Sequence, residues 1–202
     1  MPVHPIPPLL ALVLLGGCAT LASVESASRN LEAYELSAAP AAQAAVRGSR
    51  ILVVEAPAAS GALDTDRIAI KPNSNAVEYL PDARWIDPAP QHVQLLLARS
   101  VQRTGRFAMV TTEASRAETD WYLTTDLQAF QVEFDAGGIP LATVRLRAAL
   151  VSDRDRSVLG ARSFEASVPA GGTDAIQIVP AFDRAAAEVL RAATDWVVAT
   201  AR

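Results

Sequence analysis

The sequence predicts an α+β fold: a mostly antiparallel mixed sheet with two main helices packed on one face, in a single domain of residues 34–202. Residues 121–134, 141–151 and 158–168 alternate between apolar and polar side chains and are joined by short turns. That pattern is typical of an antiparallel sheet with one face in water. Two other stretches carry apolar side chains at helical spacing, which predicts two helices that each bury one side.

Shorter strands are predicted in the first half of the domain. Residues 34–36 can form a short first strand, and residues 51–54 are a continuous apolar run, as expected for a strand buried on both faces. Residues 67–71 and 77–80 flank a stretch rich in turn residues, which predicts a β-hairpin. A loop is then expected over residues 81–90, because prolines stand at both of its ends.

Both predicted helices have start and stop signals. The first begins at Pro90, which suits a first helical turn, and ends before Gly105. Thr173 or Asp174 can cap the second, and Pro180 falls inside its apolar pattern. Since proline disrupts a helix interior, we expect this helix to start or to bend at Pro180.

The long strands carry two further signals. The apolar positions of residues 121–134 change parity close to Ala129, which predicts a β-bulge or a bend there. Along residues 141–151 one face is apolar throughout, and Arg145 and Arg147 lie on the other face, which we expect to be in water.

The N-terminus predicts an export signal and a lipid anchor. A short apolar run, residues 9–15, ends in Leu-Gly-Gly-Cys, and Cys18 is the one cysteine in the 202 residues. We interpret residues 1–17 as a lipoprotein signal peptide, Cys18 as the acylated residue, with palmitate among its acyl chains, and residues 18–33 as a lipidated tether. The alternatives are an ordinary secretory signal or a structural cysteine.

Two features of this region bear on where the chain goes. Residues 1–8 hold no Lys or Arg, which departs from the usual signal, and the apolar run is shorter than the roughly 20 residues that span a bilayer. Ala19, not an aspartate, follows the cysteine, so we expect the chain to be held at the periplasmic face of the outer membrane rather than at the inner membrane.

The sequence offers no recognisable catalytic or metal-binding set, and we predict no cofactor. His92 is the only histidine after the signal peptide, and we expect it on the surface near a helix start. Asp64, Asp66, Asp82 and Asp87 fall in turn-like stretches, where aspartate is favoured by local hydrogen bonds. The formal net charge of −4 argues against a nucleic-acid partner.

Three residues are candidates for contact with a protein partner. Trp85 either closes the edge of the core or is exposed as an interface anchor, since tryptophan is enriched in such anchors. Arg145 and Arg147 either form an ordinary solvated face or bind a partner or a lipid headgroup.

The order of these features resembles that of the auxiliary lipoproteins of ABC-type transport systems, the paraquat-inducible protein C family. The resemblance rests on the lipobox, then residues 34–36, 51–54 and 67–80, Trp85 with its prolines, the first helix and the strand from Asp120 to Phe130. It implies a non-enzymatic part in lipid transport between two membranes, with an MCE-domain protein and an inner-membrane permease and ATPase as partners. Only Cys18 carries over as a functional residue.

Two other functions stay open at this point, and so does a homo-oligomer. One is a periplasmic carrier that binds a lipid or another small ligand between its sheet and helices. The other is an envelope hydrolase, for which His92 would be the candidate base.

Overall fold

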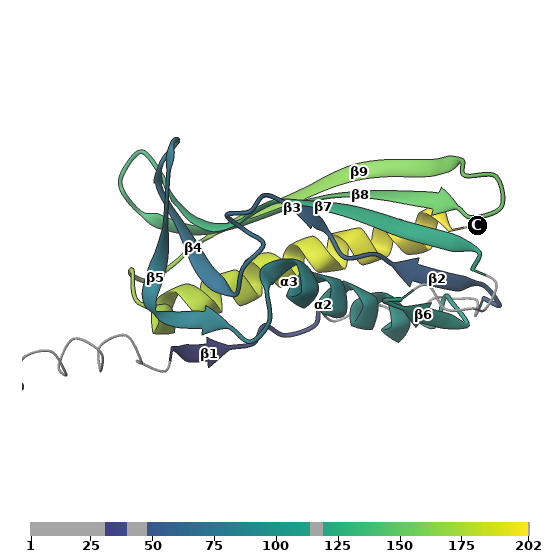
Figure 1. Ribbon diagram of the computed structural model, residues 1–202, viewed down its shortest axis with the longest axis horizontal. Helices are drawn as coiled ribbons and strands as arrows, with labels where there is room; N and C mark the ends of the chain where they lie inside the picture. The colour runs from purple at the N-terminus through teal and green to yellow at the C-terminus, as the bar shows by residue number, and fades with distance from the viewer. Residues whose placement is uncertain (1–30, 40–47, 114–118, 202) are drawn as a thin grey trace, which may run out of the picture. The chain divides into compact units, whose positions relative to one another are not determined.

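The computed structural model describes residues 31–39, 48–113 and 119–201, which hold a mixed sheet of nine strands and two helices (Figure 1). Residues 31–202 form one compact unit. The predicted α+β class is therefore confirmed. The antiparallel ladders of the sheet are its long ones, and the parallel ladders are short.

The centre of the sheet is strand β7 (Trp121–Phe134), which pairs antiparallel with β8 (Pro140–Ser152). Strand β8 pairs in turn with β9 (Val158–Pro169), so the predicted meander is confirmed. The inward-facing residues of β8 are almost fully buried, and they are the ones that the alternation predicted: Ala142, Val144, Leu146, Ala148 and Leu150.

The other side of β7 pairs with three short strands in succession, all of them parallel to it. Strand β2 (Ile51–Val54) lies beside its beginning, β3 (Ala58–Ala59) beside its middle and β4 (Arg67–Asn73) beside its last part. Strand β6 (Met109–Thr111) pairs in parallel with β2, on the side away from β7. Because β2 has a neighbour on each side, its continuous apolar run is buried, as predicted.

Strands β4 and β5 (Ala76–Trp85) form the predicted hairpin, but β5 is longer than expected. The loop predicted to start at Pro81 is wrong over residues 81–85, because these residues continue β5. The proline is tolerated because the β4–β5 register shifts around it, between the pairs Ala69↔Tyr79 and Arg67↔Arg84. The end of β5 is then paired by β1 (Glu32–Tyr34), a neighbour that comes from far away in the chain.

The bulge predicted near Ala129 is present. The pairing of β7 with β8 shifts between Leu127 and Ala129, which leaves Gln128 as the extra residue on the solvent side. The inserted residue returns Phe130 to the buried face on which Leu127 lies.

Helix α2 (Ala89–Arg103) starts next to Pro90, and Gly105 follows its end with a φ of 69°, as the stop signal predicted. Helix α3 (Ala175–Thr200) begins before Pro180, so the predicted start at the proline is wrong. The N–H groups of Gln177 and Ile178 donate to the carbonyl of Asp174 and set the start of the helix there.

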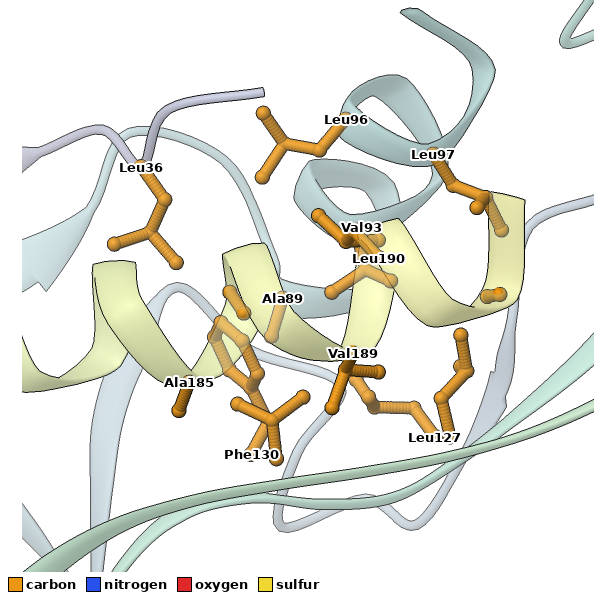
Figure 2. Close-up of a cluster of buried hydrophobic side chains, with 14 of the residues drawn as sticks. Leu36, Ala89, Val93, Leu96, Leu97, Leu127, Phe130, Ala185, Val189 and Leu190 are labelled. Carbon is orange, nitrogen blue, oxygen red and sulfur yellow. The ribbon is translucent and has the colours of Figure 1, made fainter. Parts of the chain in front are cut away.

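Both helices lie on the same side of the sheet (Figure 1). Figure 2 shows their packing: Leu127 and Phe130 of β7 point toward Ala185 and Val189 of α3, and Val93 of α2 meets α3 from the other side. Helix α3 is therefore a central layer, covered by the sheet on one side and by α2 on the other.

Candidate functional site

The predicted lipid anchor, Cys18, lies outside the described residues, so its acylation stays a prediction. The structure shows instead how the chain that arrives from it joins the domain. Strand β1 pairs in parallel with the end of β5, and the N–H of Ile86 donates to the carbonyl of Tyr34 over 2.9 Å.

Residues 34–39, which we call the docked segment, continue from β1 across both helices. The backbone N–H of Leu36 donates to His92 Nε2 of α2 over 3.1 Å, and the N–H of Ser37 donates to Asp183 Oδ1 of α3 over 2.7 Å. Glu35 lies 3.6 Å from the guanidinium of Arg99. Each of these residues is thus fastened to a helix that comes much later in the chain.

The last part of the docked segment is held through its backbone oxygens. Arg103 Nη1 donates to the carbonyl of Ala38 over 3.3 Å, and Ser100 Oγ lies 3.4 Å from the carbonyl oxygen of Ala39. The side chains of Leu36 and Ala39 are buried at 3% and 1% exposure. Figure 2 shows the side chain of Leu36 pointing from the docked segment toward α3. The docked segment is therefore part of the core as well as a polar attachment.

His92 lies beneath the docked segment and is only 3% exposed, so its predicted place on the surface is wrong. His92 lies one turn before the buried Leu96 on α2, and the backbone of Leu36 in the docked segment contacts its ring. Burial lowers the pKa of the imidazole, which the carboxylates of Asp87 and Glu35 partly oppose. A neutral ring that accepts at Nε2 carries its proton on Nδ1, which has no hydrogen-bond partner in the described part of the protein.

Trp85 is fully buried, so its interpretation as an exposed anchor for a partner is wrong and its interpretation as a core residue is confirmed. Its ring centroid lies 5.3 Å from that of Phe130, 5.2 Å from that of Phe182 and 5.9 Å from that of His92. These distances are those of favourable tilted and edge-to-face aromatic pairs. Trp85 therefore joins β5, β7, α2 and α3 in one cluster.

Arg145 and Arg147 point away from the helices. Arg145 Nε donates to Glu165 Oε2 of β9 over 2.9 Å, and Nη2 completes a bidentate pair with the same carboxylate. The pairing lowers the pKa of Glu165. Arg147 is exposed. A role for either arginine in binding a partner stays a prediction.

The chemistry available to these side chains is limited. His92 Nε2 is occupied by a backbone N–H, so it cannot take a proton from a nucleophile unless the docked segment moves. Oδ2 of Asp66 lies 3.5 Å from Nη1 of Arg84, so this turn aspartate is part of an ion pair. Over the described ranges, histidine, cysteine and carboxylate side chains do not gather in any group of three that could hold a metal. Neither α2 nor α3 is long and apolar enough to cross a membrane.

Sequence reasoning missed the docked segment and the role of His92. The sequence predicts a strand over residues 34–36, but β1 ends at Tyr34, and the apolar side chains of Leu36, Ala38 and Ala39 are the only other signal in the segment. Nothing in that stretch indicates contacts with residues 56 and 146 positions further along the chain.

The arrangement defines an α+β domain whose N-terminal segment is fixed across its two helices, in a chain with a predicted lipid anchor at Cys18. Residues 34–193 match the model of the ABC-type transport auxiliary lipoprotein component. This match spans most of the chain, and the protein belongs to that family. A membrane-anchored lipoprotein associated with ABC-type transport is the function that the family describes.

Solved structures show the same fold. Protein XCC0632 of Xanthomonas campestris, a DUF330 protein, is 25% identical with a TM-score of 0.75, over 84% of this chain and 96% of that one. Protein CT253 of Chlamydia trachomatis is 9% identical with a TM-score of 0.53, over 76% and 98% of the two chains. No curated protein matches the chain.

Proposed function

We propose that this protein is a non-enzymatic auxiliary lipoprotein of an MCE-type system that moves lipids between the inner and outer membranes. In this proposal acylated Cys18 holds the chain at the periplasmic face of the outer membrane. The domain contacts the MCE-domain protein, which works with a permease and an ATPase of the inner membrane.

The observation that carries the proposal is the family match over residues 34–193, in a chain whose N-terminus carries a lipobox ending at Cys18. The docked segment is consistent with it, since contacts with both helices fix the side of the domain from which the chain leads back toward Cys18.

The test is recovery of partners from membranes that hold the full-length chain. An MCE-domain protein should be recovered with the wild-type chain and in much smaller yield with Cys18→Ser, which cannot be acylated. Labelled palmitate should enter the wild type and not the variant. If no MCE-domain protein is recovered and deletion of the gene leaves lipid transport between the membranes unchanged, the proposal is wrong.

A further inference from the structure

Strand β9 is the outer edge of the sheet (Figure 1). Among the strands that the structure describes, it pairs only with β8, and it is 12 residues long. The other described strands with a single neighbour are β1, β3 and β6, and they have two or three residues each. The longest unpaired edge of this sheet therefore belongs to β9, since β5 is paired by β1 over residues 83–85 and leaves at most residues 76–82 without an outer neighbour.

The register shows which residues of β9 have an unused backbone. The N–H of Ala170 donates to the carbonyl of Pro140 over 2.9 Å, and the pairing continues without a shift from Leu141↔Pro169 to Leu150↔Gly160. Hydrogen-bonded pairs alternate along an antiparallel ladder. The even-numbered residues of β9 therefore bond to β8, and the N–H and C=O of four odd-numbered residues point away from the sheet: Ala161, Ser163, Glu165 and Ser167.

Natural edges are usually guarded by proline, lysine or a bulge. On β9 a register shift lies beside Val158 and a proline stands at residue 169, and between them the exposed charged residues are Arg162, whose backbone bonds to β8, and Glu165. The outward-facing residues between them are exposed and, apart from Glu165, small. The carboxylate of Glu165 is itself held by Arg145 and turned toward β8.

We propose that β9 pairs antiparallel with β9 of a second copy of this chain, around a two-fold axis, to form one continuous sheet. Such an axis runs between the two strands and keeps each side chain on its own face, so one residue of β9 lies opposite the same residue of the copy. Centring on Ser163 or on Phe164 uses nearly the whole strand.

These two registers are also compatible in charge and in apolar surface. Glu165 lies opposite Ala161 of the copy in the first register and opposite Ser163 in the second, and like charges never face each other. The exposed apolar side chains of Val158 and Leu159, at 63% and 43%, come to lie beside residues 167–170 of the copy. This self-complementarity favours a second copy as the occupant, and it does not depend on the proposed function.

The test measures the mass of the full-length chain in detergent by sedimentation and native mass spectrometry. We expect a dimer for the wild type. Ser163→Pro removes an outward N–H without touching the bonds to β8, and should weaken dimerisation at least about tenfold, or ~1.4 kcal/mol. Ser163→Ala is the matched control: it keeps the N–H, and its dimer should be as stable as that of the wild type.

Two variants that add a charge test the β9 edge without introducing a proline. They also distinguish the register centred on Ser163 from the register centred on Phe164. Ser163→Glu should weaken the dimer in both, because the new carboxylate faces itself or Glu165. Ala161→Glu should weaken the dimer only in the register that places Ser163 opposite Ser163 of the copy, because residue 161 then faces Glu165. A chain that stays monomeric at about 100 μM, far above the Kd of a specific dimer, overturns the proposal. The proposal is also overturned if the chain forms an oligomer that none of these variants weakens. It is overturned as well if β9 binds only a segment of another protein.

Discussion

Trp85 and His92 each bury a ring nitrogen that has no hydrogen-bond partner among the described residues. An unsatisfied buried N–H costs about 1–3 kcal/mol, so the packing of these rings must offset that cost. Trp85 does so through three aromatic neighbours and complete burial. At the scale of the residue, the core is held by a few large rings whose positions depend on one another.

Replacing Trp85 by alanine should lower the free energy of unfolding by about 3–5 kcal/mol, because it leaves a large cavity where four elements meet. Urea denaturation measures this change. Ile86→Ala is the matched control: its side chain is next in sequence but 48% exposed, and the expected change is within about 0.5 kcal/mol. Equal losses in the two variants would show that Trp85 is not central to the core.

His92 should make the domain less stable in acid. Its folded pKa is lowered from 6.5 by burial, so the unfolded chain binds more protons just below pH 6.5. Stability is therefore complete above pH 6.5 and falls as the pH drops from there toward the folded pKa. Protonation also removes the acceptor of the Leu36 N–H.

Thermal melts at pH 7.5 and pH 5.5, values chosen about one unit either side of the unfolded pKa, check this expectation. His92→Gln keeps an acceptor for Leu36 but does not titrate, so the melting temperature of the wild type should fall more than that of the variant on acidification. Parallel shifts in the two proteins would contradict a role for His92.

At the scale of the element, β7 changes parity once and remains buried on one face from Trp121 to Val132. The inserted residue, Gln128, makes this possible, because it restores the inward side after Leu127. The change of parity was visible in the sequence, since a bulge alters a pattern that depends only on residues a few positions apart.

Deleting Gln128 should prevent stable folding. Without the extra residue, either the first part of β7 or Phe130 and Val132 must turn toward water. Gln128→Ala is the control, and its stability should change by no more than about 0.5 kcal/mol because the backbone insertion is kept. Circular dichroism melts of the two proteins measure the difference; a cooperative melt of the deletion variant at the wild-type temperature would refute the assignment.

The docked segment gives a second expectation at this scale. Asp183→Ala removes the acceptor of the Ser37 N–H, so hydrogen exchange at Ser37 should become faster, by about tenfold for a loss of ~1.4 kcal/mol. Exchange in β7 and β8 should stay as it is. Asp195→Ala is the matched control on α3, since Asp195 pairs only with Arg191 in the interactions described. Unchanged exchange at Ser37 in Asp183→Ala would show that the segment is held by other contacts.

At the scale of the whole molecule, anchoring and folding should be separable. The described contacts of the domain begin at β1, well after Cys18. Cys18→Ser should therefore release the chain from the membrane fraction, while the melting temperature of the domain in detergent stays within about 2 °C, the shift expected for a change of ~0.5 kcal/mol. A large loss of thermal stability would mean that the lipid itself supports the fold.

The sequence by itself determined the features that follow from short-range patterns. These are the α+β class, the long meander, the hairpin, the bulge and both helices, because side-chain periodicity and turn residues act over a few positions. The N-terminal motif, which predicts the anchor, is equally local. The end of β5 was placed wrongly, since Pro81 was judged without its neighbours in space. Asp174, one of the two predicted caps, does precede α3, and only the alternative start at Pro180 is wrong.

Only the tertiary structure decided that Trp85 and His92 are buried. Trp85 and His92 have sequence surroundings that suit either the surface or the interior, and they are buried because residues 34–39 and α3 cover them. The open edge of β9 is decided in the same way, by which strands pair. Such contacts join residues far apart in the chain, and a pattern read along the sequence carries no information about them.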